Sequence, residues 1–143
     1  MAALAVIGSF LACGGDGPTA SKQLLDLSRS TLTVAPAPYV SGQTYAATLA
    51  ARDSKGDPYT RPATVAFSLS GGTSTGTFGA VANDGNGGYS TTFGALTAGT
   101  AATLSVSVDN VQIPVGARPQ ITVVPGPISL GQSSLAVGAP TLS

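Results

Sequence analysis

The chain contains no histidine, no glutamate and no tryptophan, and it has a single cysteine among its 143 residues. Histidine and glutamate are the usual general bases of enzymes, and the many serines have no imidazole partner here. One cysteine cannot form an intrachain disulfide, and one cysteine with aspartates makes a poor zinc ligand set. We therefore expect a protein that is not an enzyme and that carries no cofactor and no metal.

Charged residues are also scarce, at 8% of the chain, and six basic side chains balance six acidic ones. Typical soluble domains carry about 25% charged residues. A net charge of zero gives no electrostatic attraction for nucleic acid, so we expect no nucleic-acid partner. The abundant residues are glycine, proline, threonine, serine, alanine and valine, which favour short strands joined by tight turns. The composition therefore predicts an all-β fold.

An apolar run opens the chain and ends at Leu11-Ala12-Cys13-Gly14. Residues 1–12 are too short for a membrane span, which needs about 20 residues, but they suit the apolar part of a signal peptide. The lone Cys13 after the small Ala12 resembles the processing site of bacterial lipoproteins, where the cysteine becomes the lipid-bearing first residue. The missing basic residue near the start and Phe10 in place of leucine depart from that pattern. The alternative is a buried N-terminal strand with an inert cysteine.

The segment that follows is rich in glycine and carries serine and proline, so it buries little and bends freely. We interpret residues 1–12 as a signal peptide and residues 13–26 as a flexible tether with a lipid on Cys13. The protein is then exported and lipid-anchored to the bacterial cell envelope or outer surface, with the membrane as one partner.

Alternation of apolar and polar residues, bounded by turn sequences, recurs from Leu27 onward. The predicted strands carry these inward residues: Leu32 and Val34; Tyr45, Ala47, Leu49 and Ala51; Val65, Phe67 and Leu69; a short strand at 77–81; Tyr89, Thr91 and Phe93; Leu104, Val106 and Val108; and Ile121 and Val123 within 120–124. The apolar residues of 65–69 and 104–108 are expected to be buried together between two layers. Turns are predicted at 53–58 and 83–88, and a two-residue hairpin turn at Asp109-Asn110. About seven strands in roughly 100 residues predict an immunoglobulin-like (Ig-like) antiparallel β-sandwich over residues 27–125, with no disulfide.

Several strand and turn sequences carry a family resemblance. They are Leu49–Pro58 in the first half and, in the second half, Asp84–Ser90, Ala98-Gly99-Thr100, Leu104–Val108, Asp109–Pro114 and Ile121-Thr122-Val123. Together they resemble a bacterial Ig-like repeat of the invasin or filamin type, over about residues 27–125. The resemblance implies a non-enzymatic structural or adhesion module of the cell surface, because the bacterial members are stalks and adhesive rods.

A loose internal repeat points to an array of such modules. Ser30–Pro36 is echoed at Ser133–Pro140, about one sandwich length later, and Pro125-Gly126-Pro127 has the composition of a stiff linker. We interpret residues 126–143 as this linker and the first strand of a truncated second repeat. The chain is then one repeat of a longer exported protein, with neighbouring Ig-like repeats as partners. The alternative is a tail rich in serine, alanine and proline.

One loop offers candidate calcium ligands. Asp84 and Asn86 place oxygen atoms at alternate positions, which suits a hard cation, and Asp53 or Asp57 could join them from another loop. The sequence lacks the bidentate glutamate of calcium loops, and Asx-Gly clusters are ordinary turn sequences. Turn formation is therefore the favoured interpretation.

Tyrosines offer a candidate glycan contact, because aromatic faces stack on sugar rings. Tyr39 and Tyr59 flank turns and are expected to be exposed, whereas Tyr45 and Tyr89 fall in inward registers and are expected in the core. This leaves an alternative function, a carbohydrate-binding module accessory to an enzyme or adhesin. Surface proteins and glycans remain candidate partners under both hypotheses.

Overall fold

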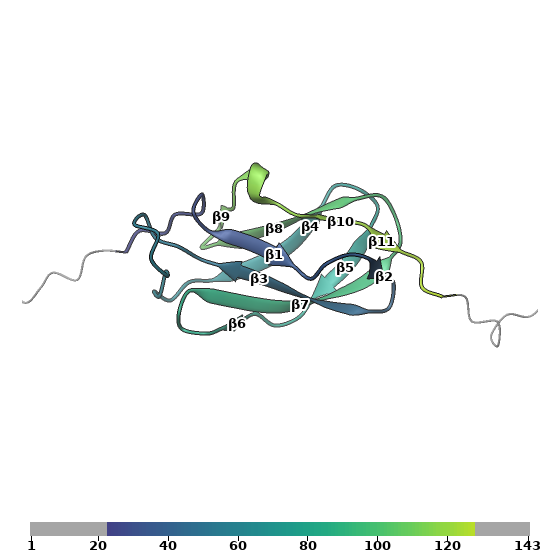
Figure 1. The fold of residues 1–143 in the computed structure, drawn as a ribbon, viewed down its shortest axis with the longest axis horizontal. Coiled ribbons are helices and arrows are strands. Elements are labelled where there is room, and N and C mark those ends of the chain that lie inside the picture. Colours follow the sequence, from purple (N-terminus) through teal and green to yellow (C-terminus); the bar gives the residue numbers. More distant parts are fainter. Residues whose placement is uncertain (1–22, 128–143) are drawn as a thin grey trace, which may run out of the picture.

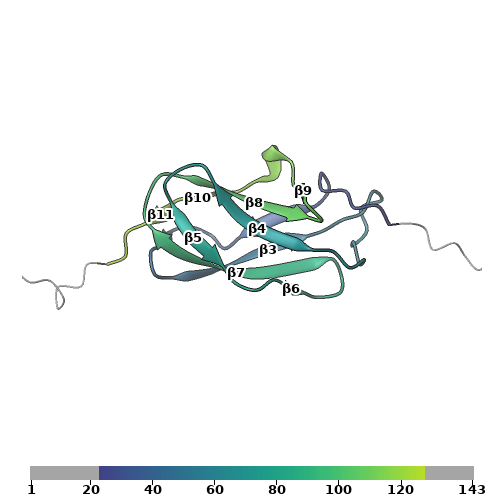
Figure 2. The same ribbon diagram turned by 180° about the vertical axis from the view of Figure 1, so that it is seen from behind.

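The computed structural model describes residues 23–127, which form a two-layer β-sandwich (Figures 1 and 2). Cys13, the predicted signal peptide, most of the predicted tether and nearly all of residues 126–143 lie outside the described residues. The described strands are β1 (Thr31–Val34), β2 (Tyr39–Val40), β3 (Thr44–Ala50), β4 (Val65–Ser70), β5 (Thr75–Phe78), β6 (Ala82–Asn83), β7 (Gly88–Thr97), β8 (Ala102–Val108), β9 (Val111–Gln112), β10 (Gln120–Ile121) and β11 (Val123–Val124). The one described helix is the short 3-10 turn η1 (Val115–Ala117), so no described helix is long and apolar enough to cross a membrane. The prediction of an all-β sandwich is confirmed.

The first layer has the strand order β1-β3-β7-β5, with β6 also paired to β7. The second layer has the order β10-β8-β4, with β9 also paired to β8. Every pair in these two layers is antiparallel. Both layers are built from the alternating segments of the sequence, because one face of each strand is apolar and must be covered by the other layer.

The predicted hairpin turn between β8 and β9 is confirmed. Asp109 and Asn110 have φ angles of 50° and 67°, and Val108 pairs with Val111 across the turn. Asp109 also closes the start of β4, since its carboxylate Oδ1 accepts a hydrogen bond of 2.8 Å from the Thr64 amide. Aspartate and asparagine suit this turn because both tolerate left-handed backbone conformations.

The predicted last strand at 120–124 divides into two short strands. Ile121 and Val123 are both buried, as predicted, but β10 pairs antiparallel with β8 while β11 pairs parallel with β2. The chain thus moves from the second layer to a separate two-stranded sheet at Thr122. The β2–β11 pair is the one parallel pair among the described strands.

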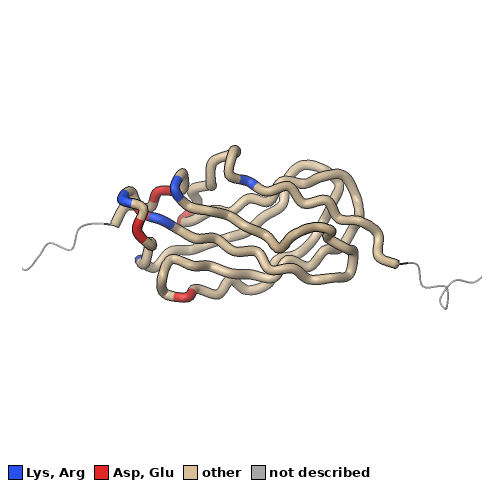
Figure 3. The backbone as a smooth tube through the Cα atoms, viewed as in Figure 1, with Lys and Arg blue, Asp and Glu red and all other residues tan. Residues whose placement is uncertain are grey.

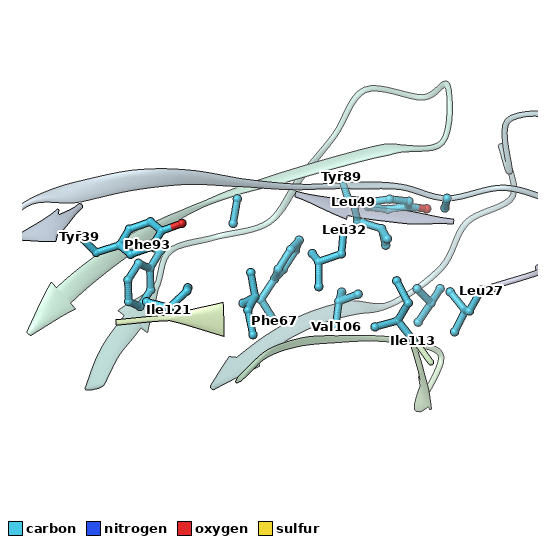
Figure 4. Packing of buried hydrophobic residues seen from close by; sticks show 14 of the residues in the cluster. Leu27, Leu32, Tyr39, Leu49, Phe67, Tyr89, Phe93, Val106, Ile113 and Ile121 are labelled. Atoms are coloured by element: carbon cyan, nitrogen blue, oxygen red, sulfur yellow. The ribbon is translucent and has the colours of Figure 1, made fainter. Parts of the chain in front are cut away.

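The core lies between the two layers and is filled from both (Figure 4). Phe93, Leu104, Val106, Val108, Ile113 and Ile121 are wholly inaccessible to solvent, each at 0% exposure. Phe67 is also buried, but Val65 and Leu69 are only half-buried. The reason is that β4 pairs with β8 on one side only, which leaves it at the edge of its layer. The prediction that the apolar residues of 65–69 and 104–108 are all buried is therefore wrong for Val65 and Leu69.

The predicted strand at 77–81 lies earlier in the chain, as β5 from Thr75 to Phe78. Gly76 sits inside this strand, and a Cβ atom there would lie 2.1 Å from an atom of the Phe93 ring. The ring covers the glycine closely, so this position admits no side chain. The sequence pattern missed the start of β5 because this glycine is typical of a loop.

The sandwich is elongated, and its two described ends lie far apart along the long axis (Figure 1). We call the end with residues 53–57, 84–87 and 109–110 the N-terminal pole, because the chain enters there. The other end, with residues 41–43, 71–74 and 97–100, is the C-terminal pole, where the chain leaves after β11.

Candidate functional site

The turn at residues 83–88 is organised by the Asp84 carboxylate. Its Oδ1 atom accepts hydrogen bonds from the amides of Asn86, at 2.7 Å, and Gly88, at 2.8 Å. These two backbone donors hold the pKa of Asp84 below its usual value, since they favour the charged form. Gly88 has no room for a Cβ atom, which would lie 2.2 Å from Asp84 Oδ2. The carboxylate thus serves as the centre of a turn.

The turn at residues 53–58 uses the same chemistry. Asp53 is buried, and its Oδ1 accepts hydrogen bonds from the amides of Lys55, at 2.9 Å, and Asp57, at 3.0 Å. Within residues 23–127, no three acidic, histidine or cysteine side chains gather where they could hold a metal ion. A calcium site at Asp84 and Asn86, with Asp53 or Asp57 as a further ligand, stays a prediction.

The expectation that Tyr39 and Tyr59 are exposed is wrong. Tyr39 is 5% exposed and Tyr59 is 8% exposed. The Tyr39 hydroxyl donates to the Ala35 carbonyl at 2.7 Å, and its ring meets the Phe93 ring edge-on at 6.4 Å. Burial raises the pKa of Tyr39. Tyr59 is covered at the other pole, where its amide donates to the Ala51 carbonyl at 3.0 Å. Neither ring offers a face on which a sugar could stack.

The other two tyrosines follow the sequence prediction in part. Tyr89 is buried at 3% exposure, whereas Tyr45 is half-buried and lies with its ring edge-on to that of Tyr39 at 5.1 Å. The Tyr45 hydroxyl accepts a hydrogen bond of 2.6 Å from the Val40 amide. This bond ties β3 to β2 at the C-terminal pole. The tyrosines therefore act mainly as structural residues.

Charge is distributed unevenly over the described surface (Figure 3). Nearly all charged residues gather at the N-terminal pole, where both signs are mixed, and the C-terminal pole carries none of them. The one described ion pair joins Arg29 to Asp26 at 3.3 Å and is partly exposed to solvent, so it adds little stability. A surface with this mixture has no patch of one sign that would attract a polyanion.

Two shallow grooves mark the described surface. A groove of about 260 Å³ runs over β1, β3 and β7 and is lined mainly by threonines and small residues such as Thr31, Thr33 and Thr48. A second groove, of about 450 Å³, lies between β4 and β5 and is lined mainly by serines, threonines and glycines. The first groove is also lined by the Asp84 carboxylate and by Ser90.

A model of the family described as "Invasin, domain 3" matches residues 26–126 of the chain. The chain belongs to this invasin domain family. The resemblance to a bacterial Ig-like repeat of the invasin type is therefore confirmed, and the family supports a cell-surface adhesion module. No curated protein matches the chain.

Solved structures of three proteins resemble the chain over about three quarters of its length. The Yersinia pseudotuberculosis adhesin InvE is 34% identical, with a TM-score of 0.62, over 75% of this chain and 29% of that one. InvD of the same organism is 32% identical, with a TM-score of 0.57, over 76% of this chain and 31% of that one. Invasin, described as a bacterial integrin-binding protein, is 26% identical, with a TM-score of 0.63, over 75% of this chain and 21% of that one. The chain thus spans less than a third of each of these three proteins.

Proposed function

We propose that this chain is a structural and adhesion module of the bacterial cell surface, one Ig-like repeat of a longer exported protein. The observation that carries the proposal is the match to the invasin domain family over residues 26–126. Support comes from the position of the two described ends at opposite poles, which is what a repeat in a linear array requires (Figure 1).

We also propose that Cys13 carries the lipid that holds this module to the cell envelope, with residues 13–26 as its tether. Support comes from the sequence alone, through the apolar run that ends at Leu11-Ala12-Cys13. The test is expression in a bacterial host with radioactive palmitate, comparing the chain with a Cys13→Ser variant. Label on the first and none on the second is expected, and an unlabelled wild-type chain contradicts the anchor.

Adhesion is tested separately from anchoring. Bacteria that lack other adhesins display the full chain on their surface, and their attachment to cultured epithelial cells is counted. A control strain displays the chain with Leu104→Asp, which places a charge in the core and prevents folding. Attachment above the control is expected, and equal attachment contradicts an adhesive role while leaving a purely structural one.

The carbohydrate-binding alternative has lost its support, because the two tyrosines on which it relied are buried. A glycan array probed with the full chain tests it directly. Binding there would revive that alternative and would identify a contact surface elsewhere on the sandwich.

A further inference from the structure

The first and last parts of the described fold pair directly with each other. Tyr39 lies opposite Val123, and Val40 lies opposite Val124, in the parallel β2–β11 pair. From β2 the chain leads back through β1 to the N-terminal pole, whereas from β11 it leaves at the C-terminal pole (Figure 1). The two strands therefore connect to opposite ends of the molecule, and a pull on those ends slides one strand along the other.

Hydrogen bonds from three loops of the C-terminal pole hold β11, and two of them come in addition to its pairing with β2. The Val123 amide donates to the hydroxyl Oγ of Ser74 at 3.0 Å, and the Val123 carbonyl accepts from the Gly99 amide at 3.0 Å. The Val124 carbonyl accepts from the Ser41 amide at 2.9 Å. Ser74 is 4% exposed, so water does not readily replace the bond it makes. A two-residue strand is thus fastened by more bonds than its strand pairing alone supplies.

The entry segment at the other pole is fastened in a similar way. The Leu24 carbonyl accepts from the Ser54 amide at 2.9 Å, and the Asp26 amide donates to the Arg52 carbonyl at 2.8 Å. Leu25 forms a bridge with Asp53 between these two bonds, and β1 then pairs with β3 over four residues. Both ends of the described chain are therefore joined to the body of the sandwich by rows of bonds.

These rows lie across the long axis of the sandwich, since hydrogen bonds between strands run across the strand direction. A pull between the poles loads all the bonds of a row together, whereas a pull that peels a strand away breaks them one at a time. We propose that this domain resists extension along its long axis, and that the β2–β11 pair with the Ser74 hydroxyl bears the force between the two ends. That this force arises during attachment rests on the proposed function, but the mechanical property belongs to the chain itself.

Single-molecule force spectroscopy tests the proposal on the full chain, held through marker domains fused to its two ends. The variant Ser74→Ala removes the acceptor of the Val123 amide. The matched control is Thr91→Val, which removes another hydroxyl bond of a buried residue, from Thr91 Oγ1 to the carbonyl of the exposed Gly79 at 2.9 Å, away from both end segments. Urea denaturation of both variants shows whether their losses of equilibrium stability are comparable.

At the same force, Ser74→Ala is expected to unfold about tenfold faster than the wild type, as the loss of one buried hydrogen bond implies. Thr91→Val is expected to unfold less than about twofold faster, because its bond does not oppose the sliding of β11 along β2. Equal acceleration of the two variants, or no acceleration by Ser74→Ala, overturns the proposal.

A second measurement keeps the test decisive if Ser74→Ala does not fold. In a Cys13→Ser background, Asn86→Cys and Val111→Cys provide exposed attachment points on the two different layers, both near the N-terminal pole. A pull between them separates the layers and peels strands, so unfolding at the same force is expected to be at least about tenfold faster than for a pull on the two ends. Equal rates in the two directions overturn the proposal. The two proposals can fail separately. If the attachment assay fails while the unfolding rate still depends strongly on the direction of pulling, adhesion is refuted and the mechanical proposal stands.

Discussion

A buried hydroxyl in the middle of β8 gives the sharpest prediction about stability. Ser105 is 2% exposed, and its Oγ atom has no hydrogen-bond partner within the described structure. Burial of a hydroxyl without a partner costs about 1–3 kcal/mol by protein mutational data. Ser105→Ala removes this hydroxyl and leaves the backbone and the neighbouring Leu104 and Val106 in place. The variant is therefore expected to be more stable than the wild type.

The expected gain is about 0.7–2.7 kcal/mol, because the weaker preference of alanine for strands offsets a few tenths of a kcal/mol of the ~1–3 kcal/mol recovered. Ser74→Ala is the matched comparison, because Ser74 is equally buried but accepts the Val123 amide. That variant is expected to lose about 1–3 kcal/mol, the cost of leaving a buried amide unpaired. The change from serine to alanine is thus expected to raise the free energy of unfolding at Ser105 and to lower it at Ser74.

Urea denaturation followed by circular dichroism measures both differences, and thermal melting gives a second reading. A change of 1 kcal/mol corresponds to about 4–8 °C in Tm for a domain of 60–100 residues. A loss of more than about 1 kcal/mol in Ser105→Ala would mean that the hydroxyl has a strong partner in solution, and the reasoning would be refuted.

Three further predictions follow from single features of the fold. Gly76→Ala is expected to destabilise by about 1–3 kcal/mol or more, because its Cβ would press on the Phe93 ring, and an unchanged urea midpoint would contradict that packing. Asp84 has a lowered pKa in the folded state, so its stabilising effect is present above the unfolded value of 3.8 and is lost as the pH falls through the folded pKa. Asp84→Asn is therefore expected to show a smaller loss of stability between neutral pH and pH below 3.8, and a parallel loss in both proteins would speak against this role. Reducing agent is expected to leave Tm unchanged, because a single cysteine forms no internal disulfide, and a shift on reduction would contradict this.

Much of the sandwich could be predicted because its longer strands alternate clearly. In β3 and β8 the inward residues Ala47, Leu49, Leu104 and Val106 are nearly inaccessible, as the two-residue period requires. The hairpin turn at 109–110 could be predicted because asparagine and aspartate accept positive φ angles. These signals are local, so a single sequence contains them.

The remaining features depend on contacts between distant parts of the chain. The β2 and β11 strands have two residues each, which is too short for alternation, and their parallel pairing joins segments that lie far apart in the sequence. Tyr39 flanks a turn in sequence and yet is buried, because β2 brings it against Phe93. Ser105 lies between two inward residues of β8, so the alternation predicts that it points outward to solvent. In the structure it is nevertheless buried, within a strand that has neighbours on both of its edges.

The fastening of the last strand, β11, to β2 and to the loops of the C-terminal pole is the claim on which the proposed mechanical resistance depends. Amide hydrogen exchange measured by NMR tests it at the amides of Ser41, Gly99 and Val123, which make the closing bonds. These amides are expected to exchange as slowly as that of Leu104 in the centre of the core, through global unfolding. Exchange at the rate of free amides at these three positions, with Leu104 still protected, would contradict the account.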